Sequence, residues 1–324
     1  MTDRRTFLKG ALISSLIGAS SHANAHGSPM KDQWISIIDL DLCDGCANLE
    51  IPACVLACKK KNQPSFPKPK KPLQPYWPQS KFEDFSEKQN QIDRLTPYNW
   101  LYVEKIQVGT KTIYAPRRCM HCFDAPCRKI CPFGAIDKSE QGAVGINPSV
   151  CFGGAKCRDV CPWEIPQRQA GVGLYLDLAP KFAGGGVMYK CDFCADLLQK
   201  GDTPSCALAC PKGAMRFMPL KQALAEIQKV AKDRFIYGQN ENGGTATWYI
   251  SSISFSQLLK AQGGSKPKGK VNGRPTWHEA KAELDLSADW AKATLATPIV
   301  AIGIAYVLNR RKKLNKSDKN NSEA

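Results

Sequence analysis

The hydrophobic pattern of the chain predicts a series of short strands, each next to a loop rich in cysteine. Apolar and polar residues alternate over 34–39, and similar strand-like runs cover 100–106, 112–115, 142–148 and 215–218. The stretches between these runs have room for a loop and a short helix. The repetition of strand, loop and short helix predicts an α+β fold made of similar units.

The chain after the last of these runs has a different periodicity. Apolar residues recur at helical spacing over 220–233, which predicts an amphipathic helix. Gly243 and Gly244 then lead into a predicted strand over 247–255, without the remaining pattern of a nucleotide-binding fingerprint. We therefore expect residues 219–290 to cover the cysteine-rich body.

The N-terminal segment has the pattern of an export signal. Arg4 and Arg5 precede a short neutral run over 10–20, and Ala23-Asn24-Ala25 forms a cleavage motif. This pattern predicts a twin-arginine signal peptide over 1–25 and a mature chain that begins near His26.

The C-terminal segment predicts a membrane anchor. Residues 293–308 carry no charge, and they lie between Trp290 and four consecutive cations over 310–313. The alternative is a buried helix, but the cations favour a transmembrane helix over 291–309 with a basic cytoplasmic tail over 310–324. Together with the signal peptide, this places the body on the periplasmic side of the inner membrane.

One internal stretch, residues 59–97, differs in composition from its surroundings. It contains eight lysines, seven prolines and several aromatic residues. A chain of this kind stays extended and forms no core of its own. We interpret it as an inserted surface arm that either contacts a partner subunit or wraps over its own domain.

The formal net charge of +16 raises the question of nucleic-acid binding. Loss of the signal peptide would lower this charge, because residues 1–25 carry Asp3 against Arg4, Arg5 and Lys9. No nucleic-acid motif accompanies the lysines. We expect no nucleic-acid partner.

The fifteen cysteines fall into four sets, with none left over. The sets are Cys43, Cys46, Cys54 and Cys58; Cys119, Cys122, Cys127 and Cys131; Cys151, Cys157 and Cys161; and Cys191, Cys194, Cys206 and Cys210. In the last three sets the final cysteine precedes a proline. Three close thiolates followed by a fourth cysteine are typical of paired iron–sulfur cubanes, in which the fourth cysteine binds the neighbouring cluster.

Other cysteine chemistries fit these sets less well. Structural zinc needs neither the third cysteine nor the following proline, and an odd count would leave one cysteine unpaired in a disulfide framework. The third set has Gly154 where the usual spacing would place a cysteine. A site with three thiolates predicts a three-iron cluster; the alternative is a fourth iron bound by water, hydroxide or another side chain.

With these four sets, the chain resembles the iron–sulfur subunits of the dimethyl sulfoxide reductase type. The resemblance rests on the cysteine sets over 34–218, and the layout is most similar to the anchored beta subunits of periplasmic nickel–iron hydrogenase and formate dehydrogenase-N. It implies two pseudo-symmetric ferredoxin-like lobes, each with two iron–sulfur clusters, plus a C-terminal transmembrane helix. One lobe would combine 34–58 with 188–218, and the other would cover 99–187.

The resemblance also implies which cysteines share a cluster. The implied groups are Cys43, Cys46, Cys54 and Cys210 for one [4Fe–4S] cluster; Cys191, Cys194, Cys206 and Cys58 for a second; Cys119, Cys122, Cys127 and Cys161 for a third; and Cys151, Cys157 and Cys131 for a [3Fe–4S] cluster. Four [4Fe–4S] clusters are the alternative. No cofactor beyond the clusters is expected.

The resemblance implies an electron-transfer subunit with no catalytic residues of its own. It would relay electrons between a large catalytic subunit, with molybdopterin or nickel–iron chemistry, and an integral membrane subunit that reacts with quinone or carries haem. The alternative is a stand-alone periplasmic ferredoxin-like carrier or redox enzyme. A stand-alone carrier would not need an anchor, an arm and four clusters.

Overall fold

The computed structural model describes residues 29–73, 82–178, 185–264 and 273–281. These residues belong to a single compact unit. The predicted signal peptide, transmembrane helix and basic tail lie outside the described residues, as does part of the arm. Within the described ranges, no helix combines the length and the apolar character needed to cross a bilayer.

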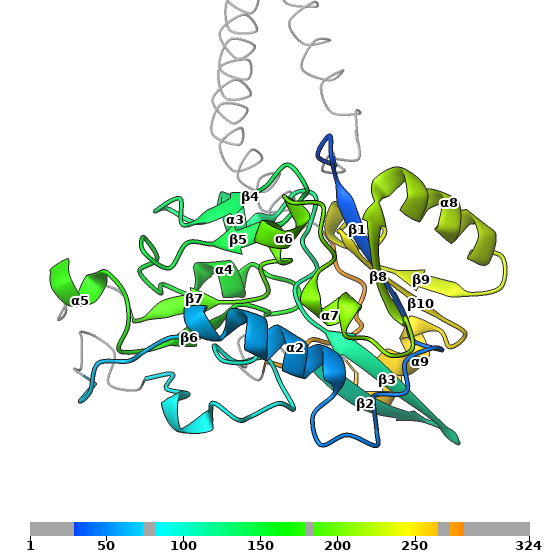
Figure 1. Ribbon diagram of the computed structural model, residues 1–324, viewed down its shortest axis with the longest axis horizontal. Coiled ribbons are helices and arrows are strands. Elements are labelled where there is room, and N and C mark those ends of the chain that lie inside the picture. Colours follow the sequence, from blue (N-terminus) through cyan, green and yellow to red (C-terminus); the bar gives the residue numbers. More distant parts are fainter. Residues whose placement is uncertain (1–28, 74–81, 179–184, 265–272, 282–324) are drawn as a thin grey trace, which may run out of the picture. The chain divides into compact units, whose positions relative to one another are not determined.

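Strands and short helices alternate along the described chain, as the sequence predicts (Figure 1). The strands are β1 Trp34–Asp39, β2 Tyr102–Val108, β3 Lys111–Arg117, β4 Ile136–Lys138, β5 Val144–Ile146, β6 Gln167–Gln169, β7 Val187–Tyr189, β8 Met215–Pro219, β9 Phe235–Tyr237 and β10 Thr247–Ser251. The α-helices are α2 Ala53–Asn62, α3 Pro126–Lys129, α4 Lys156–Asp159, α5 Tyr175–Leu178, α6 Ala195–Leu198, α7 Ser205–Leu208, α8 Leu220–Val230 and α9 Phe255–Ala261.

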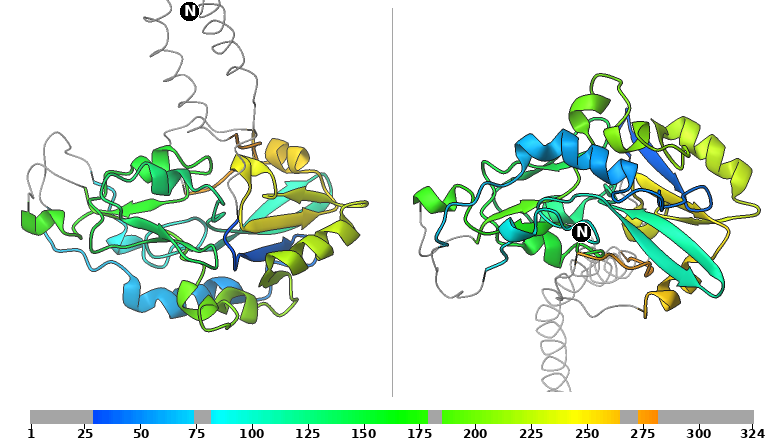
Figure 2. Two further views of the ribbon diagram at one scale, coloured as in Figure 1. Left: turned by 90° about the horizontal axis from the view of Figure 1, so that it is seen from above. Right: turned by 60° about the horizontal axis from the view of Figure 1, so that its bottom comes forward.

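A four-stranded sheet with the order β8-β1-β10-β9 forms the largest layer. β1 pairs with β10 in parallel, and the two outer pairs are antiparallel. The alternation along β1 explains its position in the middle, because Ile35 and Ile37 face one side while Ile38 faces the other. Helix α8 covers the first side, and the β2–β3 hairpin with α9 lies on the other (Figure 2).

Three antiparallel pairs complete the fold: β2 with β3, β4 with β5, and β6 with β7. The last two pairs are only three residues per strand, and they frame the second and third cysteine sets. A core cluster that includes many of the cysteines runs from these small pairs to the large sheet. The core under α8 is separate and contains no cysteine.

Three predicted elements end earlier than expected. The strand predicted over 142–148 is β5, which ends at Ile146, and the helix predicted over 220–233 ends at Val230. The predicted strand over 247–255 stops at Ser251, and Phe255 begins helix α9. The reason is a capping box, in which the Ser254 side chain accepts from the backbone N–H of Gln257 while the Gln257 side chain accepts from the backbone N–H of Ser254.

Candidate metal centres

All fifteen cysteines are free thiols, and they gather around four cavities. Cys43, Cys46, Cys54 and Cys210 line site 1; Cys58, Cys191, Cys194 and Cys206 line site 2; Cys119, Cys122, Cys127 and Cys161 line site 3; and Cys131, Cys151 and Cys157 line site 4. The structure therefore brings together the same cysteines that the resemblance groups.

Sites 1 and 2 share a pair of helices. Helix α2 carries Cys54 at site 1 and Cys58 at site 2, one turn apart on the same face. Helix α7 packs against α2, and its cysteines reach the two sites in the reverse order. Cys206 lies at site 2, and Cys210, just beyond the end of α7, lies at site 1. These two sites form what we call the first lobe.

Sites 3 and 4 repeat the arrangement with shorter helices. Helix α3 holds Cys127 at site 3, and Cys131 follows it at site 4. Helix α4 contacts α3 and holds Cys157 at site 4, with Cys161 returning to site 3. These two sites form the second lobe.

The four sites follow one another in numerical order. Burial raises the pKa of Cys54 at site 1, and the thiolate of Cys206 at site 2 raises it further. Burial raises the pKa of Cys157 at site 4, and Cys127 at site 3 adds to that effect.

The two lobes meet between sites 2 and 3. Burial raises the pKa of Cys191 at site 2; nearby Arg118 lowers it, and among the negative groups that raise it is Cys119 at site 3. Charge contacts of this kind fall off with distance, and so each site is electrostatically close to the next.

The cavities suit clusters of positive metal ions. Burial raises the pKa of Cys43 to about 11 and that of Cys161 to about 12, so that four buried thiolates need added positive charge. Among the described residues, no three His, Cys, Asp or Glu side chains are gathered as ligands of one metal ion. A cubane differs because each thiolate binds a separate iron, which spaces the sulfurs around a cavity.

Site 4 differs from the other three sites in its number of cysteines and in its size. The empty space there, part of which is open to solvent, is about 460 Å³, against about 300 to 350 Å³ at the others. Gly154 lines this cavity, and a Cβ atom added there would meet open space. Its neighbour Gly153 has a φ of +67°, and a side chain there would collide with the backbone of Gly186.

The described parts of the arm wrap over their own domain. Ala170 donates its N–H to the carbonyl of Glu83, and Lys70 donates to the carbonyl of Gly171. The Glu83 carboxylate also accepts from Arg158, at 2.6 and 2.9 Å. Of the two predicted roles, wrapping over its own domain therefore describes these residues of the arm. They bind to the segment around site 4.

His121, which lies between Cys119 and Cys122 of site 3 in the sequence, is buried. Its Nδ1 atom accepts from the backbone N–H of Val144 at 3.0 Å, and its ring packs on Phe193. Burial, with the positive charges of Lys190 and Arg118, holds the pKa of His121 well below its usual value. The ring is therefore uncharged at neutral pH.

Two buried cations near the sites were not predicted from the sequence. Arg118 lines site 2 and Lys190 lines site 3, and each is less than a tenth exposed. Each directly precedes the first cysteine of a set, but many surface lysines and arginines have similar neighbours in the sequence. The position in front of a cysteine is the one local signal that could have singled them out.

Comparison with known proteins points to one kind of protein. Residues 110–220 match the family model of a 4Fe-4S dicluster domain. The thiosulfate reductase electron transfer subunit PhsB of Salmonella typhi is 30% identical over 220 residues, which cover 65% of this chain and 88% of the relative. The hydrogenase-2 operon protein HybA of Escherichia coli O157:H7 is 26% identical over 302 residues, covering 79% and 83%.

A third relative comes from an archaeon. The putative iron-sulfur subunit of dimethyl sulfoxide reductase from Halobacterium salinarum is 28% identical over 268 residues, which cover 79% of this chain and 86% of the relative. These relatives thus match a larger share of the chain than the dicluster model, which covers residues 110–220 with the second, third and fourth cysteine sets.

Proposed function

The chain belongs to the family of iron–sulfur electron-transfer subunits of oxidoreductase complexes, and we propose from this that its four sites form a single path for electrons. It is an electron-transfer subunit and not an enzyme on its own. The observation that carries the proposal is the row of four cysteine-lined cavities, each linked to the next by a shared helix pair or by adjoining cysteines.

We assign [4Fe–4S] clusters to sites 1, 2 and 3 and a [3Fe–4S] cluster to site 4. The assignment follows the thiol count, with four cysteines at each of the first three sites and three at the last. When bound, such clusters supply one-electron redox chemistry. The backbone at Gly154 has room for a larger side chain, so that a cysteine could be accommodated there without a clash.

The protein's own groups set the conditions for transfer. Backbone N–H groups of Met188 and Phe193 point at the sulfurs of Cys151 and Cys191, at 3.5 and 3.4 Å. Such hydrogen bonds stabilise negative charge on sulfur and raise a cluster's potential. Most of the other residues that line each cavity are apolar, and each cavity also contains at least one positively charged side chain: Lys212 at site 1, Arg118 at site 2, Lys190 at site 3 and Lys156 at site 4.

We propose that the two ends of the row face different partners. Leu42 and Leu49 are about half exposed beside site 1, and Phe133 is about half exposed beside site 4, where it stacks on Phe152. Exposed apolar side chains of this kind are common at subunit interfaces. Site 1 would receive electrons from, or pass them to, a large molybdopterin or nickel–iron subunit, and site 4 would face a quinone- or haem-containing membrane subunit.

The location is part of the same proposal. We propose a periplasmic body, exported by the twin-arginine pathway and held at the inner membrane by residues 291–309. Protease added to spheroplasts should degrade the cluster-bearing body and leave the basic tail protected. Protection of the body in spheroplasts would contradict this topology.

Native purification tests the function. The tagged chain, isolated without oxygen from gently solubilised membranes, should bring down a large redox subunit and contain about 15 iron atoms per chain. Electron paramagnetic resonance of the reduced complex should show interacting clusters. An isolated, fully active single chain would instead support the stand-alone carrier.

A further inference from the structure

Two short segments at the meeting point of the lobes are related in sequence and conformation. Residues 118–122 read Arg-Cys-Met-His-Cys and residues 190–194 read Lys-Cys-Asp-Phe-Cys. In both, the residue before the second cysteine has a positive φ, +49° at His121 and +65° at Phe193. The two rings pack against each other with centroids 4.3 Å apart. The segments therefore face each other across an approximate two-fold relation.

The side chain of Arg118 extends from the segment of site 3 to the cavity of site 2. Arg118 precedes Cys119 of site 3, yet its guanidinium lines site 2, where Nη1 lies 3.9 Å from the sulfur of Cys191. The side chain packs between Phe193 and Phe217. Its Nε and Nη2 atoms are buried without a hydrogen-bond partner among the described residues. A buried arginine with free donors needs a negative partner in the cavity that it lines.

Lys190 crosses in the opposite direction. It precedes Cys191 of site 2, yet it lines site 3 together with Cys119 and Cys127. Its Nζ donates to the carbonyl groups of Val144 and Cys191. Its amine therefore lies in a buried position, with two carbonyl acceptors and beside the cysteines of site 3.

We propose that Arg118 and Lys190 are a crossed pair of cations that set the reduction potentials of the two central clusters. Arg118, from the segment of site 3, raises the potential of the cluster at site 2. Lys190, from the segment of site 2, raises the potential of the cluster at site 3. A positive charge stabilises the more negative, reduced form of a cluster, and burial leaves this attraction poorly screened. Two cations at equivalent positions bring the potentials of sites 2 and 3 close together. The step across the lobe boundary then proceeds readily in either direction.

The step itself moves one electron. With clusters held by the cysteines of sites 2 and 3, that electron would pass from one site to the other, and no bond or proton would change place. The two cations take up neither the electron nor a proton. Their role is to stabilise the reduced cluster through its negative charge. This inference rests on the proposed function, since it needs clusters at both central sites.

The test is a redox titration of the native complex followed by electron paramagnetic resonance. Lys190→Met should lower the equilibrium constant for reduction of site 3 at least tenfold. For one electron this lowers the potential of site 3 by about 59 mV, and the change at site 2 should be smaller. Arg118→Gln should do the reverse. Lys190→Arg keeps the charge and should restore the potential of site 3.

Signals are assigned with Cys122→Ala and Cys194→Ala, which alter site 3 and site 2 respectively. Lys212→Met is the matched control, since Lys212 lines site 1 but is more than half exposed and pairs with Asp44. The proposal would be overturned if Lys190→Met shifted the potential of site 2 as much as that of site 3. It would also be overturned if the shifts in potential were no larger than in the control. If Lys190→Met loses its clusters, Arg118→Gln decides by the same criterion. A wild-type complex without signals from both central sites would instead refute the proposed function.

Discussion

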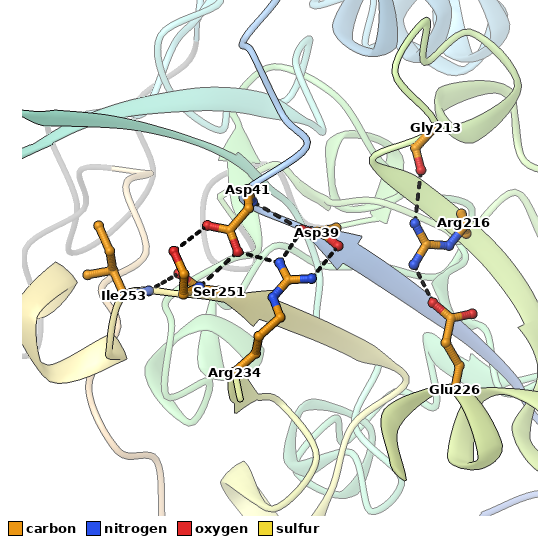
Figure 3. Close-up of polar contacts among 9 residues, drawn as sticks. Asp39, Asp41, Gly213, Arg216, Glu226, Arg234, Ser251 and Ile253 are labelled. Atoms are coloured by element: carbon orange, nitrogen blue, oxygen red, sulfur yellow. Dashed lines mark hydrogen bonds and ion pairs between the residues drawn. The ribbon is translucent and has the colours of Figure 1, made fainter. Parts of the chain in front are cut away.

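Both ends of the row of sites are fastened by three charged side chains, but the central charge has the opposite sign at the two ends. Near site 1, Arg234 donates to Asp39 and Asp41, which lead into Cys43 (Figure 3). Burial would raise the pKa of Asp39, but the hydrogen bonds and charge of Arg234 hold it below its usual value. Here one cation joins two carboxylates.

Near site 4, one carboxylate joins two cations. Glu83 of the arm accepts from Arg158, next to the ligand Cys157, and from Arg168 of β6 at 2.7 Å. Arg168 also donates to the carbonyl of Gly153 at 2.9 Å. Burial would raise the pKa of Glu83, but hydrogen bonds and charge from both arginines lower it.

The difference shows how each lobe is supported. Asp39 and Arg234 are already held close by the four-stranded sheet, in which β1 and β9 both pair with β10. Arg158 and Arg168 belong to segments with three-residue strands and four-residue helices, and Glu83 comes from a distant arm. The first network therefore adds to an existing sheet, whereas the second holds together pieces with little secondary structure of their own.

Removal of iron should show the largest difference between the region around site 4 and the sheet that supports site 1. The core between that sheet and α8 contains no cysteine, while the larger core, which runs through both lobes, includes cysteines from all four sites. Metal binding and folding are coupled in sites of this kind. After anaerobic chelation we expect loss of amide protection around α3 and α4, with protection retained in β1, β10 and α8, as measured by hydrogen exchange. Equal loss in both regions would break the comparison.

The next largest effect is expected from Glu83→Gln. The substitution leaves Arg158 and Arg168 buried without their carboxylate, and loss of one partner of a buried ion pair costs about 3 kcal/mol. Hydrogen exchange of the cluster-loaded protein should show this as a lower opening free energy over residues 151–171.

Glu226→Gln is the matched control for that substitution. Glu226 pairs with Arg216 on the first lobe, where both side chains are about one-third exposed (Figure 3). An exposed pair contributes less than about 1 kcal/mol. Similar losses in Glu226→Gln and Glu83→Gln would show that the arm adds nothing special to site 4.

A smaller effect is expected from Asp39→Asn. Arg234 keeps Asp41 as its partner, and the sheet keeps β1 in place, so that only the charged hydrogen bonds of Asp39 are lost. We expect a loss of about 1.5 kcal/mol in the opening free energy of β1. A loss larger than that of Glu83→Gln would mean that the sheet depends on its charge network as much as the second lobe does.

Alternation and helical spacing are local signals, and they predict strands β1, β2, β3, β5, β8 and β10 and helix α8. The strands β4, β6, β7 and β9 were not predicted, because a strand of three residues is too short to show a periodic pattern. The error at the end of β10 arises from the Ser254 capping box, a local signal that was present in the sequence but outweighed by the apolar run. The cysteine sets predict clusters, but their grouping into sites came from family resemblance. No local pattern indicates that Arg118 reaches Cys191 or that Glu83 reaches Arg158, since folding brings these residues together from distant segments.

The central claim is that the chain holds a row of four clusters in which site 4 alone lacks a fourth iron. The proposed ligands Cys131, Cys151 and Cys157 line that cavity, and Gly154 leaves open space beside them. Placed at the end of the row, a three-iron centre would accept electrons readily, because such centres usually have higher potentials than their four-iron neighbours.

The most direct measurement is electron paramagnetic resonance of the oxidised, freshly isolated complex. The account predicts a three-iron signal with g of about 2 and an intensity of about one spin per chain. Gly154→Cys should weaken this signal and lower the potential of the site. Gly145→Cys should leave the signal unchanged, because Gly145 also faces open space but does not line site 4. Absence of the signal from intact protein, or a signal unaffected by Gly154→Cys, would contradict the account.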